Sequence, residues 1–112
     1  MAANYDINIE QGATFTFTLT VTGINLTGYT ARMQGRTSHA ASATAFSLTS
    51  SPAAGLVVTP GTNSTIAVTL TATQTAALSA PTEGVYDLEY TDGTTVVRIL
   101  EGSYRITPEV TR

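Results

Sequence analysis

Two carboxylates and an arginine form the most chemically suggestive group in the sequence. Asp87 and Glu89 are separated by one residue, so a β-strand would place both side chains on one face. Such a pair could cleave a sugar bond, because glycosidases use two carboxyl groups that flank the bond. Arg98 lies on the predicted partner strand and offers a simpler alternative, an ion pair across the sheet. We favour the ion pair over catalysis.

The only histidine, His39, lies in a stretch of small polar residues at positions 37–44. A catalytic histidine needs a nucleophile to activate and usually a carboxylate behind it, and no sequence neighbour of His39 supplies either. The chain has no cysteine, which excludes thiolate nucleophiles, disulfides and cysteine-based zinc sites. We therefore predict that the protein is not an enzyme and has no catalytic, cofactor-binding or metal-binding residues. Residues 37–44 are predicted to form an exposed, flexible loop that orders only on assembly.

Neither the glycines nor the threonines indicate a ligand site. Gly61, Gly93 and Gly102 do not precede a helix in the way that a phosphate-binding loop requires. The threonine-rich stretch at residues 13–22 could bind ice or sugars in principle, but a plain solvated strand face is the simpler interpretation. We expect no cofactor and no small-molecule substrate.

The balance of charge narrows the classes of partner. Only 12% of the 112 residues are charged, about half of the roughly 25% that is usual in a soluble domain. The basic residues are five arginines without any lysine, too few for a patch that binds nucleic acid or an anionic membrane. No apolar run approaches the ~20 residues of a membrane-spanning helix, and the first residues do not resemble a signal peptide. We expect neither nucleic acid nor membrane as a partner, and a surface partly covered by other proteins.

The elements that would position these residues are β-strands. In residues 13–22, Phe15, Phe17, Leu19 and Val21 alternate with threonines, which predicts a half-buried strand because successive side chains point to opposite faces. We place the apolar side in the core, together with most of the aromatic residues. On that basis Phe17→Ala is predicted to lower the free energy of unfolding by ~3–5 kcal/mol.

Turn residues separate the other strands. Residues 60–63 and the Asp92-Gly93 pair predict tight hairpin turns between strands. Gly102 lies inside a later alternating segment, where it predicts a bulge or bend.

One segment departs from the strand pattern. Thr71 and Gln74 fit a capping box that begins a short helix near residues 71–78, and Pro81 prevents its continuation. Short strands at regular spacing before and after it are typical of a β-sandwich. The sequence therefore predicts a single all-β domain over residues 1–112, an Ig-like antiparallel β-sandwich of about eight short strands with one short helix.

Five stretches of the sequence carry a resemblance to a known family. They read YDINIEQGATF, LTGYTARMQ, GVYDLEY, LEG and TPEVTR, and they begin at Tyr5, Leu26, Gly84, Leu100 and Thr107. The chain resembles small virion-associated proteins of tailed bacteriophages and prophages, which are similar to the Ig-like N-terminal domain of baseplate upper proteins. The resemblance covers nearly the whole chain with its motifs in order, and it is weakest in the middle.

The resemblance implies a multi-copy structural part of a virion, made in the host bacterial cytoplasm. It implies docking to other virion proteins and to copies of the chain itself, at a tail, a baseplate or a fibre attachment. The motif residues suit structure rather than catalysis: Gly12 and Gly28 suit turns, and Leu26, Tyr29 and Met33 suit the core. Two alternatives stay open, a decoration protein on the capsid surface and a carbohydrate- or receptor-binding module.

Overall fold

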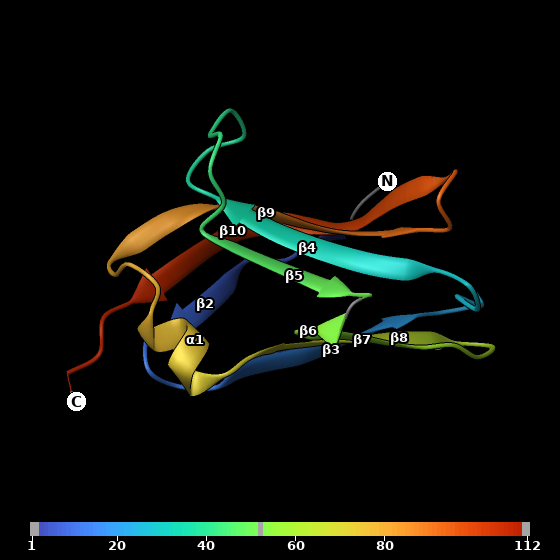
Figure 1. Ribbon diagram of the computed structural model, residues 1–112, viewed down its shortest axis with the longest axis horizontal. Coiled ribbons are helices and arrows are strands. Elements are labelled where there is room, and N and C mark those ends of the chain that lie inside the picture. The colour runs from blue at the N-terminus through green and yellow to red at the C-terminus, as the bar shows by residue number, and fades with distance from the viewer. Residues whose placement is uncertain (1–2, 52, 111–112) are drawn as a thin grey trace.

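Two β-sheets lie face to face in the computed structural model, which describes residues 3–51 and 53–110 (Figure 1). The strands in chain order are β1 (Ala3–Asn4), β2 (Ile7–Glu10), β3 (Phe15–Val21), β4 (Thr30–Arg36), β5 (Phe46–Ser50), β6 (Ala53–Ala54), β7 (Leu56–Thr59), β8 (Ser64–Leu70), β9 (Thr82–Thr91) and β10 (Val96–Thr107). Sheet A has the order β1-β10-β9-β4-β5-β6, with β2 also paired to β10. Sheet B has the order β3-β8-β7.

The predicted all-β sandwich with one short helix is confirmed. The threonine-rich alternation forms β3, and the two predicted hairpins are the antiparallel pairs β7-β8 and β9-β10. The helix α1 (Ala72–Ala76) begins with the predicted capping box. In it the Gln74 amide donates to Thr71 Oγ1 at 3.2 Å and the Thr71 amide donates to Gln74 Oε1 at 2.8 Å, which satisfies two amides that the helix leaves unpaired.

The N-terminal strands add a feature that the sequence did not reveal. Both β1 and β2 pair with β10 in parallel, whereas the other strand pairs of the sandwich are antiparallel. Because β2 and β10 lie at opposite ends of the chain, no tight turn forces them to run antiparallel. As a consequence, both N-terminal strands belong to sheet A and neither covers the edge of sheet B.

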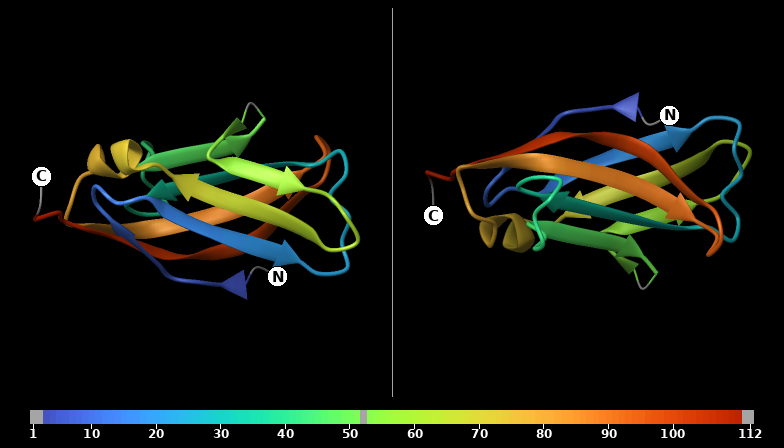
Figure 2. Two further views of the ribbon diagram at one scale, coloured as in Figure 1. Left: turned by 90° about the horizontal axis from the view of Figure 1, so that it is seen from below. Right: turned by 90° about the horizontal axis from the view of Figure 1, so that it is seen from above.

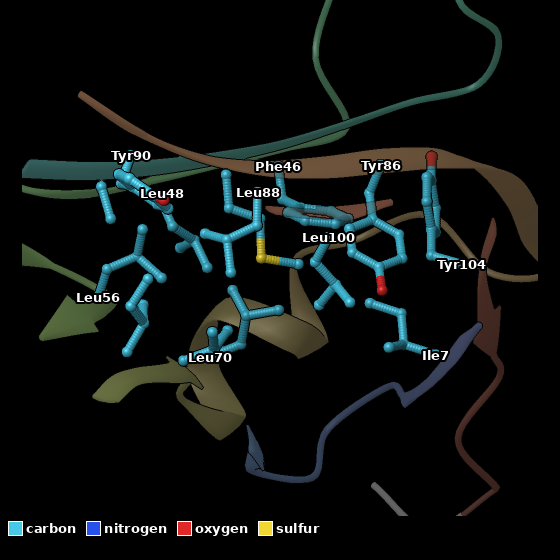
Figure 3. Packing of buried hydrophobic residues seen from close by; sticks show 14 of the residues in the cluster. Ile7, Phe46, Leu48, Leu56, Leu70, Tyr86, Leu88, Tyr90, Leu100 and Tyr104 are labelled. Atoms are coloured by element: carbon cyan, nitrogen blue, oxygen red, sulfur yellow. The ribbon is translucent and has the colours of Figure 1, made fainter. Parts of the chain in front are cut away.

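A continuous apolar core fills the space between the sheets (Figure 3). Met33, Leu88 and Leu100 point inward from sheet A, and Ile66 and Val68 meet them from sheet B. The inward residues alternate with outward polar ones along each strand, as expected when one face of a sheet is buried. The core therefore fixes which side chains each sheet presents to the outside.

The predicted bulge in the last strand is displaced from Gly102. The register of β10 against β9 shifts between Arg98 and Leu100, while Gly102 stays in regular register opposite Tyr86. Gly102 is needed for another reason, because a Cβ there would collide with the carbonyl oxygen of Tyr5. The glycine signals a close approach of two backbones, which is the second common use of glycine in a strand.

The loop between β4 and β5 projects outward on the side of sheet A that faces away from sheet B (Figure 1). Its residues 37–44 are almost all exposed, as predicted. Arg36 fixes its base, because Nη1 donates to the carbonyl oxygens of Ala41 and Ser42 at 3.0 and 2.9 Å. Ordering of the loop on assembly stays a prediction.

Candidate interaction surfaces

The outward side chains of β4, β9 and β10 form a surface that we call the charged face. Their neighbours along each strand, such as Met33 and Leu88, are buried, so strand alternation turns the charged residues outward. The charged face consists of Arg32, Arg36, Glu83, Asp87, Glu89, Arg98, Glu101 and Arg105.

Ion pairs connect most of these groups across neighbouring strands. Arg98 Nε lies 3.3 Å from Asp87 Oδ2, which confirms the predicted pairing of Arg98 with one of the two carboxylates. Arg98 Nη1 also lies 3.6 Å from Glu101 Oε1. Glu89 is directly opposite Arg98 in the strand register, yet its Oε1 accepts from Arg32 Nε on β4 at 2.8 Å. The sequence missed this partner because it did not show which strand flanks β9 on its other side.

Asp87 is a carboxylate of the charged face whose pKa is shifted by its surroundings. Partial burial raises its pKa above the ordinary value, and the nearby charge of Glu89 raises the pKa further. The charges of Arg98 and Arg32 act in the opposite direction without cancelling the effect. A raised pKa suits an acid catalyst. Asp87 and Glu89, however, each form an ion pair with an arginine, Asp87 with Arg98 and Glu89 with Arg32.

His39 lies closer to these groups than the sequence indicated. It lines a shallow polar depression of about 520 Å³ on the outside of sheet A, together with Asp87, Arg36, Arg98 and Ser103. In the described part of the chain, no hydrogen bond or ion pair joins His39 to a carboxylate or a hydroxyl group. The arrangement therefore provides a polar hollow without the paired nucleophile and base that acyl-transfer chemistry requires.

Metal sites and membrane spans are two further features that residues 3–51 and 53–110 could contain. Within these ranges, no group of three or more histidine, aspartate or glutamate side chains is placed to hold a metal ion. No helix in the same ranges has the length and apolar character needed to cross a membrane.

The outer side of sheet B differs from the charged face because it carries no charge. We call it the neutral face, because β3, β7 and β8 contain no charged residue. Its side chains form rows across the three strands, and in the central row Thr18, Ala67 and Val57 are register neighbours. The side chains of the neutral face are those of Thr16, Thr18, Thr20, Val57, Thr59, Thr65, Ala67 and Thr69.

The neutral face ends at an open strand edge (Figure 2, left). Strand β3 pairs with β8 on one side, and in the described part of the chain no strand pairs with its other side. Proteins usually protect such an edge with a charge, a proline or a bulge, because its free amides and carbonyls can pair with another chain. Strand β3 has seven residues and none of these protections.

The open edge corrects one expectation about the aromatic residues. Phe15, Phe17 and Leu19 point inward as predicted, but they are only partly buried, and Tyr5 is 50% exposed. The Tyr5 and Phe15 rings each contact Phe17 edge to face, with centroids 5.7 Å apart. These side chains stay partly exposed because, among the described residues, no further strand extends sheet B over them. Phe17 therefore belongs to the rim of the core rather than to its centre.

Buried hydroxyl groups hold both ends of β3. Thr75 in α1 is fully buried, and its Oγ1 donates to the Ala13 carbonyl at 2.8 Å and accepts from the Gly12 amide at 3.0 Å. At the far end Ser64 is also fully buried, and its Oγ accepts from the Leu26 amide at 2.9 Å. These contacts fix the turns that enter and leave β3. The open edge is therefore a pre-organised strand rather than a loose segment.

No protein-family model matches the chain, and no curated protein sequence matches it significantly. The two outer faces and the resemblance carried by the sequence are therefore the features that bear on function.

Proposed function

We propose that the protein is a non-enzymatic structural component of a tailed bacteriophage virion. In this role it is a multi-copy Ig-like module that docks or anchors other virion proteins at a tail, a baseplate or a fibre attachment. Its partners are other virion proteins and copies of itself, with no role for nucleic acid, a membrane or a small-molecule substrate.

The observation that carries the proposal is the neutral face with its open edge at β3. In a protein that works alone in solution, surface charge increases solubility, and protected strand edges prevent pairing with other chains. This chain concentrates its charge on sheet A and leaves sheet B uncharged and open along β3. Such a surface is suited to permanent contact with another protein, which is what a virion part requires.

The charged face supports a structural role in a different way. Ion pairs with Arg98 and Arg32 hold Asp87 and Glu89, the two residues best suited to acid–base chemistry. His39 shares a depression with Asp87 without a hydrogen bond to it among the described residues. Substitution of His39, Asp87 and Glu89 by alanine is accordingly expected to leave infectivity unchanged, as measured by plaque titre. A fall of several orders of magnitude with normal virion assembly would favour an enzymatic role.

The location can be tested in the particle itself. Virions purified from the bacterial host that carries the gene would be separated into heads and tails, and the protein would be quantified in each fraction by mass spectrometry. We expect it in the tail fraction in a fixed ratio to the other tail proteins. Recovery with heads would overturn the tail assignment in favour of capsid decoration, and absence from both fractions would overturn the virion role altogether.

A further inference from the structure

We propose that β3 pairs edge to edge with β3 of a second copy of this chain, antiparallel and about a twofold axis at Thr18. The two copies of sheet B then form one continuous sheet in the order β7-β8-β3-β3-β8-β7. This inference deepens the proposed assembly role and rests on it, but it concerns contact between two copies rather than a place in the virion.

Strand β3 is the longest open edge among the described residues. At the other side of sheet B, β7 has four residues and is followed by Pro60, which has no amide to donate. In sheet A the outermost strands β1 and β6 have two residues each. Only β3 offers seven residues in regular strand conformation with one side unpaired.

The side-chain pattern of β3 is complementary to itself. In an antiparallel pair centred on Thr18, Phe17 lies opposite Leu19 of the second copy, and Phe15 lies opposite Val21. Residues directly opposite one another point to the same face of a sheet, so apolar side chains meet apolar ones and threonines meet threonines. A shift of register by one residue would turn every side chain of the second strand to the wrong face. The pattern therefore excludes shifts by an odd number of residues, and among the remaining registers the axis at Thr18 is the one that pairs all seven residues of β3.

The absence of charge in and around β3 allows two copies of the strand to pair. The sequence has no charged residue between Glu10 and Arg32, so a pair of β3 strands brings no like charges together. The alternation of β3 matches its own, so a second copy supplies the complementary pattern that an unrelated strand would have to reproduce. A twofold contact between identical surfaces is also the commonest arrangement in homo-oligomers.

The pairing would complete the part of the core that is now open. Phe15, Phe17 and Leu19 are partly buried, and Tyr5 is exposed beside Phe17. A second strand beside β3 would extend sheet B over this side of the sandwich and remove apolar surface from water. Because Thr75 and Ser64 already fix both ends of β3, little conformational entropy would be lost on pairing.

Two substitutions of opposite charge test the twofold axis. In the full-length protein, Thr18→Lys or Thr18→Glu would place two like charges next to each other at the axis, and each is expected to weaken self-association by about tenfold or more. A mixture of the two variants brings opposite charges together and should restore the dimer. Thr59→Lys, on the exposed face of β7, is the matched control and should associate as the wild type does. Sedimentation velocity over a range of concentrations measures the two Thr18 variants, their mixture, the control and the wild type.

The wild type also allows a test without any substitution. Hydrogen exchange of residues 15–21 should slow as the protein concentration rises, while exchange in β9 stays constant. A wild type that remains monomeric to millimolar concentration would overturn the inference, and so would a Thr18→Lys dimer as stable as that of the wild type. Neither result would affect the location experiment, because a monomeric module can still be found in separated tails.

Discussion

The two outer faces of this sandwich differ in their charge and in the protection of their strand edges. On sheet A, cross-strand ion pairs such as Arg32–Glu89 and Arg98–Asp87 give a hydrated surface that discourages contact. On sheet B, threonine, alanine and valine side chains cover a surface without charge, and β3 leaves one strand edge open. Both faces cover the same core, so the difference does not come from folding requirements. Under the proposed assembly role, sheet A is the side that stays in water and sheet B is the side that a partner covers.

The largest effects should come from the core that both sheets share. Leu88 is fully buried at the centre of the sandwich, so Leu88→Ala should lower the free energy of unfolding by about 3–4 kcal/mol through the cavity it leaves. Phe17 lies at the open rim, so Phe17→Ala should cost less, about 2 kcal/mol, which revises the value expected from the sequence. Denaturant unfolding of both variants measures the difference. A larger loss for Phe17→Ala would mean that β3 is not at an open edge.

Smaller losses of unfolding free energy should follow when the hydroxyl groups that hold the ends of β3 are removed. Ser64→Ala removes the acceptor of the Leu26 amide, and Thr75→Ala removes the acceptor of the Gly12 amide. Each change leaves a backbone group without its partner, and each should cost about 1–3 kcal/mol of unfolding free energy. Thr59→Ala, an exposed threonine of sheet B, is the matched control and should lie within error of the wild type. Equal stabilities for all three variants would show that the hydroxyl groups do not anchor the strand.

The ion pairs of the charged face should contribute least to folding. Arg32→Ala removes the best-aligned pair, at 2.8 Å, and should cost only ~0.2–1 kcal/mol because Arg32 is largely exposed. The loss should shrink further in concentrated salt, since exposed pairs are screened. Unfolding curves at low and high salt measure it, and a loss above about 2 kcal/mol would show that the charged face stabilises the fold rather than only hydrating it.

Titration of the Asp87 carboxyl group should give the smallest change in folding stability, and the direction of this change with pH can be stated. Its pKa is raised in the folded protein, first by burial and then by Glu89, so the folded state keeps the proton to higher pH than the unfolded state does. The stability of the wild type should therefore fall as the pH rises from the ordinary carboxyl pKa through the raised value. Asp87→Asn removes this loss, so the stability of the variant should increase relative to that of the wild type as the pH rises above the ordinary carboxyl pKa. If it loses ground instead, the attraction of Arg98 outweighs burial.

The sequence predicted local features well because they depend on nearby residues. The alternation in β3, the capping box of Thr71 and Gln74, and the hairpin turn at Gly93 are each set by a few neighbouring residues, and each is present in the structure. The pairing of Arg98 with one of the two carboxylates was also within reach, because one hairpin brings their strands together. The register places Glu89 opposite Arg98, so the choice of Asp87 could not be predicted.

Features that depend on distant parts of the chain were out of reach. Pairing of β2 with β10 joins the two ends of the sequence, and nothing in either segment indicates which sheet takes the N-terminal strands. The open edge of β3 and the partial exposure of Phe17 follow from that one choice. The position of His39 in the same depression as Asp87 depends in a similar way on how the loop at 37–44 lies over sheet A.

Hydrogen exchange in free and virion-assembled protein tests the central claim most directly, because it reads both faces in one experiment. We predict that amides of β3 exchange more slowly in the virion, while those of β9 on the charged face exchange at the same rate in both forms. The loop at residues 37–44 reports separately whether it orders on assembly. Unchanged exchange in β3 together with new protection in β9 would contradict the account, because it would make the charged face the surface that is covered.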